Sequence, residues 1–252
     1  MTTPSDANDQ LSPEAREIYY AGLWQSPTLR STEPNPTEAE RLRIIQSLLG
    51  KAFGDRKSDQ RQILDAGCGR GWLCPYLSEW GTTLGIDPLR SSIDSARTLF
   101  PGLTFEIATV EQLEGNTFDL VLSSEVIEHT DDHAAYIRGI AKVMTAGGFL
   151  ILTMPRAEVY AKFTQVFPRH LQQPVENWLD RTTLLESCRR AGLELVAEHR
   201  IFELFTTKGA WRLFGSPRVS RFMNSTSLTS TWLKRLKDSH ALYFCGLFRK
   251  AQ

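Results

Sequence analysis

The chain has 252 residues and no net charge, because 29 Lys and Arg residues balance 29 Asp and Glu residues. Hydrophobic residues make up 41% and charged residues 23%, which excludes a disordered, highly charged chain and provides enough apolar material for a sizeable core. The polar N-terminus lacks a signal-peptide pattern, no apolar run approaches the ~18 residues of a membrane span, and the cysteines lack the spacing of a disulfide framework or zinc site. We therefore expect a soluble, cytoplasmic protein with one large domain and no metal site.

The N-terminal region is predicted to be helical. A serine followed by a proline is typical of a helix start, and it places a first helix at residues 12–23. A proline-rich loop at 25–36 leads into a second helix over 37–53, where apolar residues recur at helical spacing. We expect residues 1–58 to form a helical extension.

Short apolar runs alternate with helical patterns from residue 61 onward. Continuous apolar strands separated by helices are typical of a parallel sheet that is covered on both faces. The predicted strands occupy 61–67, 82–87, 103–108, 118–124 and 149–155, and the helices between them occupy 72–80, 89–99 and 131–145. A further helix at 182–191 precedes two strands, 193–204 and 241–250, which we expect to pair in antiparallel fashion at the sheet edge.

A glycine-rich turn, Asp65-Ala66-Gly67-Cys68-Gly69-Arg70-Gly71, follows the first predicted strand. Glycines allow positive φ angles and let a ligand approach the backbone. The bulky Trp72 after the last glycine departs from the nicotinamide dinucleotide fingerprint. Asp87 ends the second strand, where a carboxylate can bind both hydroxyls of a ribose or, alternatively, cap the next helix. Together the two features indicate an adenosine-type ligand across the strand ends.

Four motifs then occur in the order and spacing of a known family: ILDAGCGRG (63–71), GIDP (85–88), FDLVLSSEVIEHTDD (118–132) and MTAGGFLILTMPR (144–156). With them, residues 60–202 resemble the class I S-adenosylmethionine-dependent methyltransferases, particularly the small-molecule branch that includes ubiquinone-biosynthesis and sugar O-methyltransferases. The resemblance implies an α/β, Rossmann-like fold with a seven-stranded, mostly parallel sheet in the order 3-2-1-4-5-7-6, strand 7 antiparallel, and helices on both faces. It also implies a methyltransferase domain at 59–252 with an insertion at 205–239 between the last two strands.

The resemblance implies S-adenosylmethionine as the cofactor and assigns residues to its parts. The glycine turn would run beneath the methionine portion, with Asp65 orienting the turn and the amino group and Asp87 holding the ribose hydroxyls. After the third strand, the acidic or amide residue that usually touches the adenine is replaced by Thr109-Val110, although the Thr109 side chain and the Val110 N–H can still hydrogen-bond. The implied cofactor-binding residues are Asp65, Gly67, Cys68, Gly69, Gly71, Asp87, Pro88, Thr109, Val110, Ser124 and Glu125.

Methyl transfer to a hydroxyl requires alignment of the acceptor and removal of its proton. In related O-methyltransferases a histidine at the position of His129 serves as the base, so the resemblance makes His129 the first candidate. His170, after the fifth strand, is a second candidate, and for both histidines packing or capping is the alternative role. Glu125 and Glu128 more often orient the backbone or neighbouring charges.

Tyr19 and Tyr20 of the first predicted helix, and Trp24 directly after it, are candidates for a lid that excludes water from the cofactor. Simple packing of an amphipathic helix is the alternative interpretation. The chain has no Asn-Pro-Pro-Tyr or Asp-Pro-Pro-Tyr after the fourth strand, which disfavours methylation of the amino groups of nucleic-acid bases.

The balanced total charge hides an uneven distribution. Residues 101–180 carry 5 basic and 11 acidic groups, whereas residues 208–252 carry 9 and 1. In the basic, aromatic insertion, Trp211, Arg218 and Arg221 are candidates for contact with an anionic or carrier-linked small-molecule acceptor. An acidic lipid surface is a second functional alternative, and a solvated helical cap that closes the pocket is the structural one. We expect O-methylation of a metabolite or sugar-containing intermediate. The sequence leaves open N- or C-methylation, a non-catalytic cofactor-binding subunit and the oligomeric state.

Overall fold

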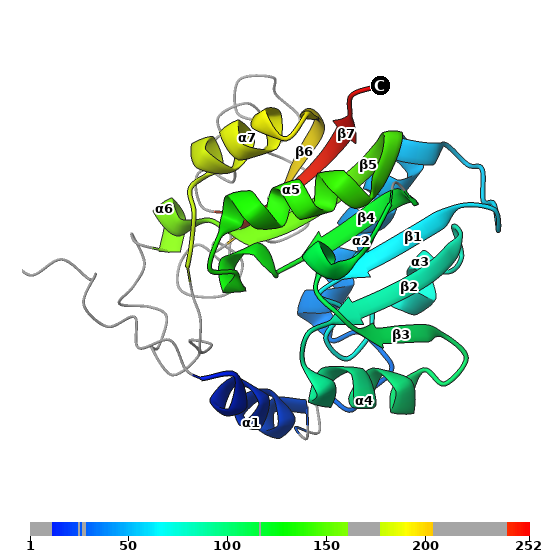
Figure 1. The fold of residues 1–252 in the computed structure, drawn as a ribbon, viewed down its shortest axis with the longest axis vertical. Helices are drawn as coiled ribbons and strands as arrows, with labels where there is room; N and C mark the ends of the chain where they lie inside the picture. The colour runs from blue at the N-terminus through cyan, green and yellow to red at the C-terminus, as the bar shows by residue number, and fades with distance from the viewer. Residues whose placement is uncertain (1–11, 25, 27–28, 116, 161–176, 204–240) are drawn as a thin grey trace, which may run out of the picture.

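A seven-stranded sheet organises the chain in the order β3-β2-β1-β4-β5-β7-β6 (Figure 1). The structure is a computed structural model, and it describes residues 12–24, 26, 29–115, 117–160, 177–203 and 241–252. The strands are β1 (Gln62–Ala66), β2 (Thr82–Asp87), β3 (Thr104–Ile107), β4 (Phe118–Ser124), β5 (Met144–Pro155), β6 (Leu193–Glu203) and β7 (Ala241–Lys250). Strand β7 pairs in antiparallel fashion with both β5 and β6, while the other pairs are parallel. The predicted strand order and direction are therefore confirmed.

The order of the strands reverses at β1, which pairs with β2 on one side and β4 on the other. In a parallel sheet of this kind, ligands bind outside the carboxyl ends of the strands at the point of reversal. Asp65 lies near the carboxyl end of β1, and Asp87 ends the neighbouring β2. The topology thus brings the glycine turn, Asp87 and the loop after β4 to one edge of the sheet.

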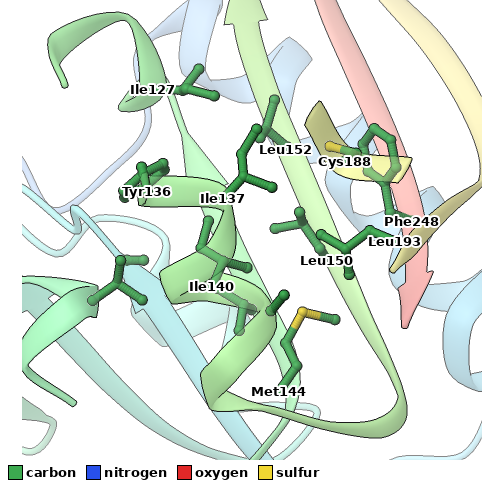
Figure 2. Close-up of a cluster of buried hydrophobic side chains, with 14 of the residues drawn as sticks. Ile127, Tyr136, Ile137, Ile140, Met144, Leu150, Leu152, Cys188, Leu193 and Phe248 are labelled. Carbon is green, nitrogen blue, oxygen red and sulfur yellow. The ribbon is translucent and has the colours of Figure 1, made fainter. Parts of the chain in front are cut away.

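One face of the sheet is covered by α5 (His133–Val143) and α7 (Arg181–Arg190). Figure 2 shows Ile137 and Ile140 of α5 directed toward Leu150 and Leu152 of β5. These four side chains are fully buried, so the hydrophobic effect holds α5 against the centre of the sheet. Asp132 accepts a hydrogen bond from the Ala135 N–H and caps the helix at the end nearest the candidate site.

The opposite face is covered by α2 (Pro36–Phe53) and the short α3 (Cys74–Leu77). Asn35 and Glu38 form a capping box that begins α2, with Asn35 at the end of the predicted loop and Glu38 inside the predicted helix. Ile45, Leu48 and Leu49 of α2 are fully buried in a core shared with β4, β5 and β7. Helix α2, within the region expected to be an extension, therefore shares its core with the sheet.

Two predicted helices are shorter in the structure. The helix expected over 72–80 is reduced to the single turn of α3, flanked on both sides by non-helical turns. The helix expected over 131–145 ends at Val143, because Met144 already pairs with Phe118 and begins β5. In the second case the end of the helix is set by strand pairing and not by the helical periodicity of the sequence.

Helix α1 (Pro13–Trp24) lies beside α4 (Arg90–Leu99), at the edge of the sheet that carries the candidate site (Figure 1). The remaining short elements are η1 (Val110–Gln112), η2 (Ile127–His129) and α6 (Ala157–Tyr160). Within the described part of the chain, no helix combines the length and apolarity needed to cross a bilayer.

Candidate active site

The glycine turn is packed tightly, and a Cβ atom at any of its three glycines would press on a neighbouring side chain, at Gly71 on Phe105 at 2.7 Å. At Gly67, with φ of 77°, an added Cβ would stand 2.5 Å from a methyl group of Val126. At Gly69, with φ of 53°, an added Cβ would stand 3.2 Å from the indole ring of Trp24. The turn is thus held between the loop after β4 and helix α1, and it needs residues without a Cβ.

Asp87 fastens the glycine turn to the end of β2. One carboxylate oxygen accepts a hydrogen bond from the Gly69 N–H at 3.1 Å, and the other accepts from the Leu89 N–H at 3.0 Å. Burial raises the pKa of this carboxyl, while the two backbone donors oppose the shift. Each oxygen has a second lone pair, so the carboxylate can also accept from a ribose diol. The N-cap of α4 is Leu89 and not Asp87, so the alternative interpretation of Asp87 as the cap of this helix was wrong.

Asp65 is the most deeply buried acid of the site, with 2% of its surface exposed. Burial raises its pKa to about 7, and a hydrogen bond from the Cys74 thiol, 3.2 Å from Oδ2, works in the other direction. Cys68 is buried as well, and its N–H joins that of Gly67 in donating to the carbonyl of Ile86. A buried carboxylate beside the turn is suited to an ammonium group.

The segment after β3 is held by its own hydrogen bonds. The Thr109 N–H donates to Oε1 of Gln112 at 2.8 Å, and Val110 is buried against α5 near Gly139. Pro88, on the neighbouring strand end, is exposed. The adenine contacts expected of Thr109 and Val110, and the cofactor contact expected of Pro88, stay predictions.

The loop after β4 contains a strained residue. Glu125 has φ of 59°, and it is the one non-glycine residue with positive φ in the part of the chain that the structure describes. Its N–H donates to Thr153, its Oε1 accepts from the Thr153 hydroxyl at 2.8 Å, and its Oε2 lies 3.3 Å from Arg41 of α2. Ser124 bonds the same hydroxyl at 3.1 Å. These contacts hold Glu125 in its strained conformation.

The candidate base His129 ends η2, where its N–H donates to the carbonyl of Val126 at 2.8 Å. Glu128 beside it is buried. His129 therefore shares a short, fixed loop with Val126, the residue that packs on Gly67. His170 lies outside the described residues, as do Trp211, Arg218 and Arg221 of the insertion.

Helix α1 lies across this edge of the sheet. Trp24 packs on Gly69 and donates through Nε1 to Ser92 at 3.0 Å, and Glu17 accepts from the Ser91 N–H of α4. Tyr20 is stacked with Trp24, and burial together with the charges of Asp87 and Glu128 raises its pKa. At the other end Arg16 lies 3.7 Å from Asp131, beyond η2.

Tyr19 contacts Tyr20 edge to face but is more than one third exposed. Of the three aromatic residues singled out in the sequence, Tyr20 and Trp24 therefore face the site and Tyr19 is turned toward solvent.

Several residues of the site were missed in the sequence. Arg70, almost completely buried, binds Glu38 at 2.8 Å and so joins the glycine turn to the start of α2. Three further residues were missed. Arg41 and Thr153 contact the carboxylate of Glu125, and the thiol of Cys74 donates to the carboxylate of Asp65. The capping pattern Asn-x-x-Glu was the available signal for Glu38, whereas the partners of Arg41 and Cys74 depend on tertiary contacts.

A hollow of about 330 Å³ lies at the opposite edge of the sheet, where β1, β4 and β5 begin. Arg61, Asp119 and Phe149 are among its lining residues. The length of the strands separates it from the glycine turn, so it is not part of the candidate site.

The geometry fits S-adenosylmethionine. Two buried acids with raised pKa values flank a turn that Cβ atoms would obstruct, at the reversal point of the sheet. A cationic amino group and a ribose diol are the ligand groups that would satisfy Asp65 and Asp87. Fold and site together define a class I S-adenosylmethionine-dependent methyltransferase.

Comparison with known proteins agrees with this class. A family model described as a methyltransferase domain matches residues 38–198, and the chain belongs to this family. A ubiquinone biosynthesis O-methyltransferase of Rhizobium rhizogenes is 30% identical over 195 residues, which is 73% of this chain and 77% of the relative. The enzyme of the same name from Agrobacterium fabrum is 28% identical with the same coverage.

A solved structure with a similar fold is the N-methyltransferase NodS of Bradyrhizobium japonicum in complex with S-adenosylhomocysteine. It has a TM-score of 0.61 and 14% identity, and the similarity covers 94% of this chain and 99% of NodS. At this identity the likeness concerns the fold alone. The family match, the fold and the site together identify the protein as a methyltransferase enzyme that uses S-adenosylmethionine. The acceptor of the methyl group has to be argued separately.

Proposed function

We propose that this enzyme transfers a methyl group to a hydroxyl of a small molecule, with His129 as the general base. The observation that carries the proposal is the similarity, up to 30% over 73% of the chain, to O-methyltransferases of ubiquinone biosynthesis. The proposed acceptor is accordingly a hydroxylated small molecule of the kind used in that biosynthesis. A sugar-containing intermediate is a second hydroxyl acceptor of the same reaction type.

The roles of the residues follow from their positions. The cofactor, when bound, supplies a methyl group on a positively charged sulfur. Asp65 would bind its amino group, the backbone of 67–71 would lie along its methionine portion, and Asp87 would accept from its ribose hydroxyls. His129 would take the proton of the acceptor hydroxyl, so that oxygen attacks as the stronger nucleophile.

Helix α1 is proposed to close the site. Trp24 and Tyr20 lie over the glycine turn and beside Asp87, and Glu17 and Arg16 fasten the helix to α4 and to the loop beyond η2. A cover of this kind excludes water from the reacting atoms. Because the same contacts cover the turn, we expect α1 to move aside when the cofactor enters or leaves and to close over the bound cofactor.

The experiment that tests this function measures transfer of labelled methyl from S-adenosylmethionine to a catechol acid, a monosaccharide and sarcosine. We expect transfer to a hydroxyl acceptor and a loss of about 100-fold or more in kcat for His129→Ala, the usual contribution of a general base. His199→Ala is the control, because His199 lies on β6 beside the cations of α2.

Three outcomes would contradict the proposal in different ways. Methylation of sarcosine alone would favour an N-methyltransferase. Unchanged turnover in His129→Ala would show that His129 is not the general base. Calorimetry without binding of S-adenosylmethionine or S-adenosylhomocysteine would leave only a non-catalytic role.

The basic insertion supports a separate part of the proposal, that the acceptor is anionic or carrier-linked. The insertion at 205–239 carries 7 basic groups against 1 acidic group, which predicts acceptor binding that weakens with salt. Arg218→Glu and Arg221→Glu should raise KM about tenfold without changing cofactor affinity, as expected for loss of one charged contact. An unchanged KM would contradict this part.

A further inference from the structure

We propose that the thiol of Cys74 is a positioning group, which holds the Asp65 carboxylate in place for the amino group of the cofactor. The inference rests on the cofactor of the class and on no particular acceptor. It adds to the reaction a residue that has no part in the sequence motifs used to recognise the family.

The geometry that carries this proposal is a buried contact at the start of α3. Cys74 Sγ lies 3.2 Å from Asp65 Oδ2, and both side chains are almost completely inaccessible to solvent. The Cys74 N–H also donates to the carbonyl of Gly71 at 3.1 Å. One residue therefore contacts both ends of the turn 65–71, the acid through its side chain and the last glycine through its backbone.

The direction of the hydrogen bond follows from the chemistry of the two groups. Burial, with the nearby Asp65 and Cys68, raises the pKa of the Cys74 thiol far above its ordinary value, so the thiol stays protonated and can only donate when Asp65 is charged. The same burial makes the thiol a poor nucleophile. A positioning role suits this cysteine better than a reactive one.

The surroundings of Asp65 make this one donor important. The titratable groups that face it are Cys74 on α3, Cys68 in the turn, Asp87 on β2 and Tyr136 on α5. All four are neutral or negative, so in the described part of the chain no cation is placed to stabilise the carboxylate. Burial and Asp87 favour the neutral acid, and the thiol favours the charged acid that an ammonium group binds.

A pH dependence of cofactor binding follows. With a pKa of about 7 in the free protein, Asp65 is mostly neutral at pH 6 and mostly charged at pH 8. Affinity for a ligand that requires the charged form should fall by about tenfold between pH 8 and pH 6. Removal of a hydrogen bond to the charged form moves this transition to higher pH, and a stronger donor moves it to lower pH.

The test is calorimetry of S-adenosylhomocysteine binding between pH 5.5 and 8.5 for the intact protein, Cys74→Ala and Cys74→Ser. Loss of the hydrogen bond from Cys74 should raise the pKa of Asp65 by about one unit. We therefore expect Cys74→Ala to bind about fivefold more weakly than the intact protein at pH 7 and about twofold more weakly at pH 8. Cys74→Ser, whose hydroxyl is a stronger donor, should bind at least as well as the intact protein at pH 7. Cys188→Ala is the matched control, because Cys188 is an equally buried thiol on α7.

The alternative outcomes are distinct. A loss in Cys74→Ala that is equal at every pH would mean that the thiol only fills space, and would overturn the proposal. Asp65→Asn should abolish the change in cofactor affinity between pH 6 and pH 8. If the change survives in this variant, it belongs to Asp87, and the proposal is overturned as well. Thermal unfolding of each variant without ligand, followed over the same pH range, keeps a folding defect apart from a binding defect. None of these measurements needs the methyl acceptor. They therefore test the role of Cys74 even if the proposed O-methylation is wrong.

Discussion

The indole ring of Trp24 lies 3.2 Å from the position that a Cβ atom on Gly69 would take, so helix α1 rests directly on the glycine turn. Trp24→Ala should therefore expose the turn and weaken S-adenosylhomocysteine binding about tenfold, or ~1.4 kcal/mol. Trp24→Phe keeps a ring but loses the bond to Ser92, and a smaller loss of about fivefold is expected. Calorimetry measures both, with Trp80→Phe, on the opposite edge of the sheet, as the control. Equal affinity in Trp24→Ala would mean that α1 only packs.

Gly67→Ala should destabilise the protein more than a substitution at another glycine of similar backbone angle. The new Cβ would meet Val126 at 2.5 Å, whereas at Gly54, with φ of 63°, it would meet nothing within 4 Å. We expect a loss of about 1 kcal/mol for Gly54→Ala, from backbone strain, and about 3 kcal/mol for Gly67→Ala, from strain and overpacking. Urea denaturation checks this, and Val126→Ala should rescue part of the loss only in the Gly67 variant.

Asp65→Asn should stabilise the ligand-free protein while weakening cofactor binding. The pKa of Asp65 is raised from 3.8 in the unfolded chain to about 7 in the folded one. The folded state therefore binds the proton more tightly, and the contribution of Asp65 to stability is present below pH 4 and is lost as the pH rises to 7. Relative to Asp65→Asn, the free energy of unfolding of the intact protein should fall by a few kcal/mol, to order of magnitude, between about pH 4 and pH 7. Unfolding curves at pH 4.5, 6 and 8 that run parallel for the two proteins would contradict the assignment.

The ion pair between Arg41 and Glu125 should be worth more than a surface pair, since both side chains are largely buried. Arg41→Met leaves Glu125 without its cation and should cost about 3 kcal/mol. Burial already raises the pKa of Glu125 and Arg41 opposes it, so the loss in Arg41→Met should grow as the pH rises above the ordinary pKa of glutamate. Arg43→Met, an exposed neighbour on α2, is the control.

A double-mutant cycle completes this test. The variant with Arg41→Met and Glu125→Gln together should be more stable than Arg41→Met alone, because it removes the buried charge. Additive losses in unfolding free energy would indicate that the two residues act independently.

The sheet could be predicted from the sequence because short, mostly apolar runs such as 118–124 and 149–155 alternate with helical patterns, and their length and this alternation are typical of buried parallel strands. The turn 65–71 and Asp87 were also predictable, since their chemistry depends on local order and spacing. Arg41 was not, because 84 positions separate it from Glu125 and only the packing of α2 on the sheet brings them together. The helix predicted over 72–80 is shorter in the structure for a related reason, since the ends of α3 are set by the turn and not by helical periodicity.

Glu38 uses one carboxylate for two tasks, since it accepts from the Asn35 N–H in the capping box and binds Arg70 of the glycine turn. Arg70 also donates to the carbonyl of Ser31. Fraying at the start of α2 and loosening of the turn therefore belong to one cooperative opening. A ligand that steadies the turn should slow hydrogen exchange at the N–H groups of Thr37 and Glu38, which donate to Asn35. Occupancy of the active site can then be followed at amides that lie more than 30 residues away along the chain.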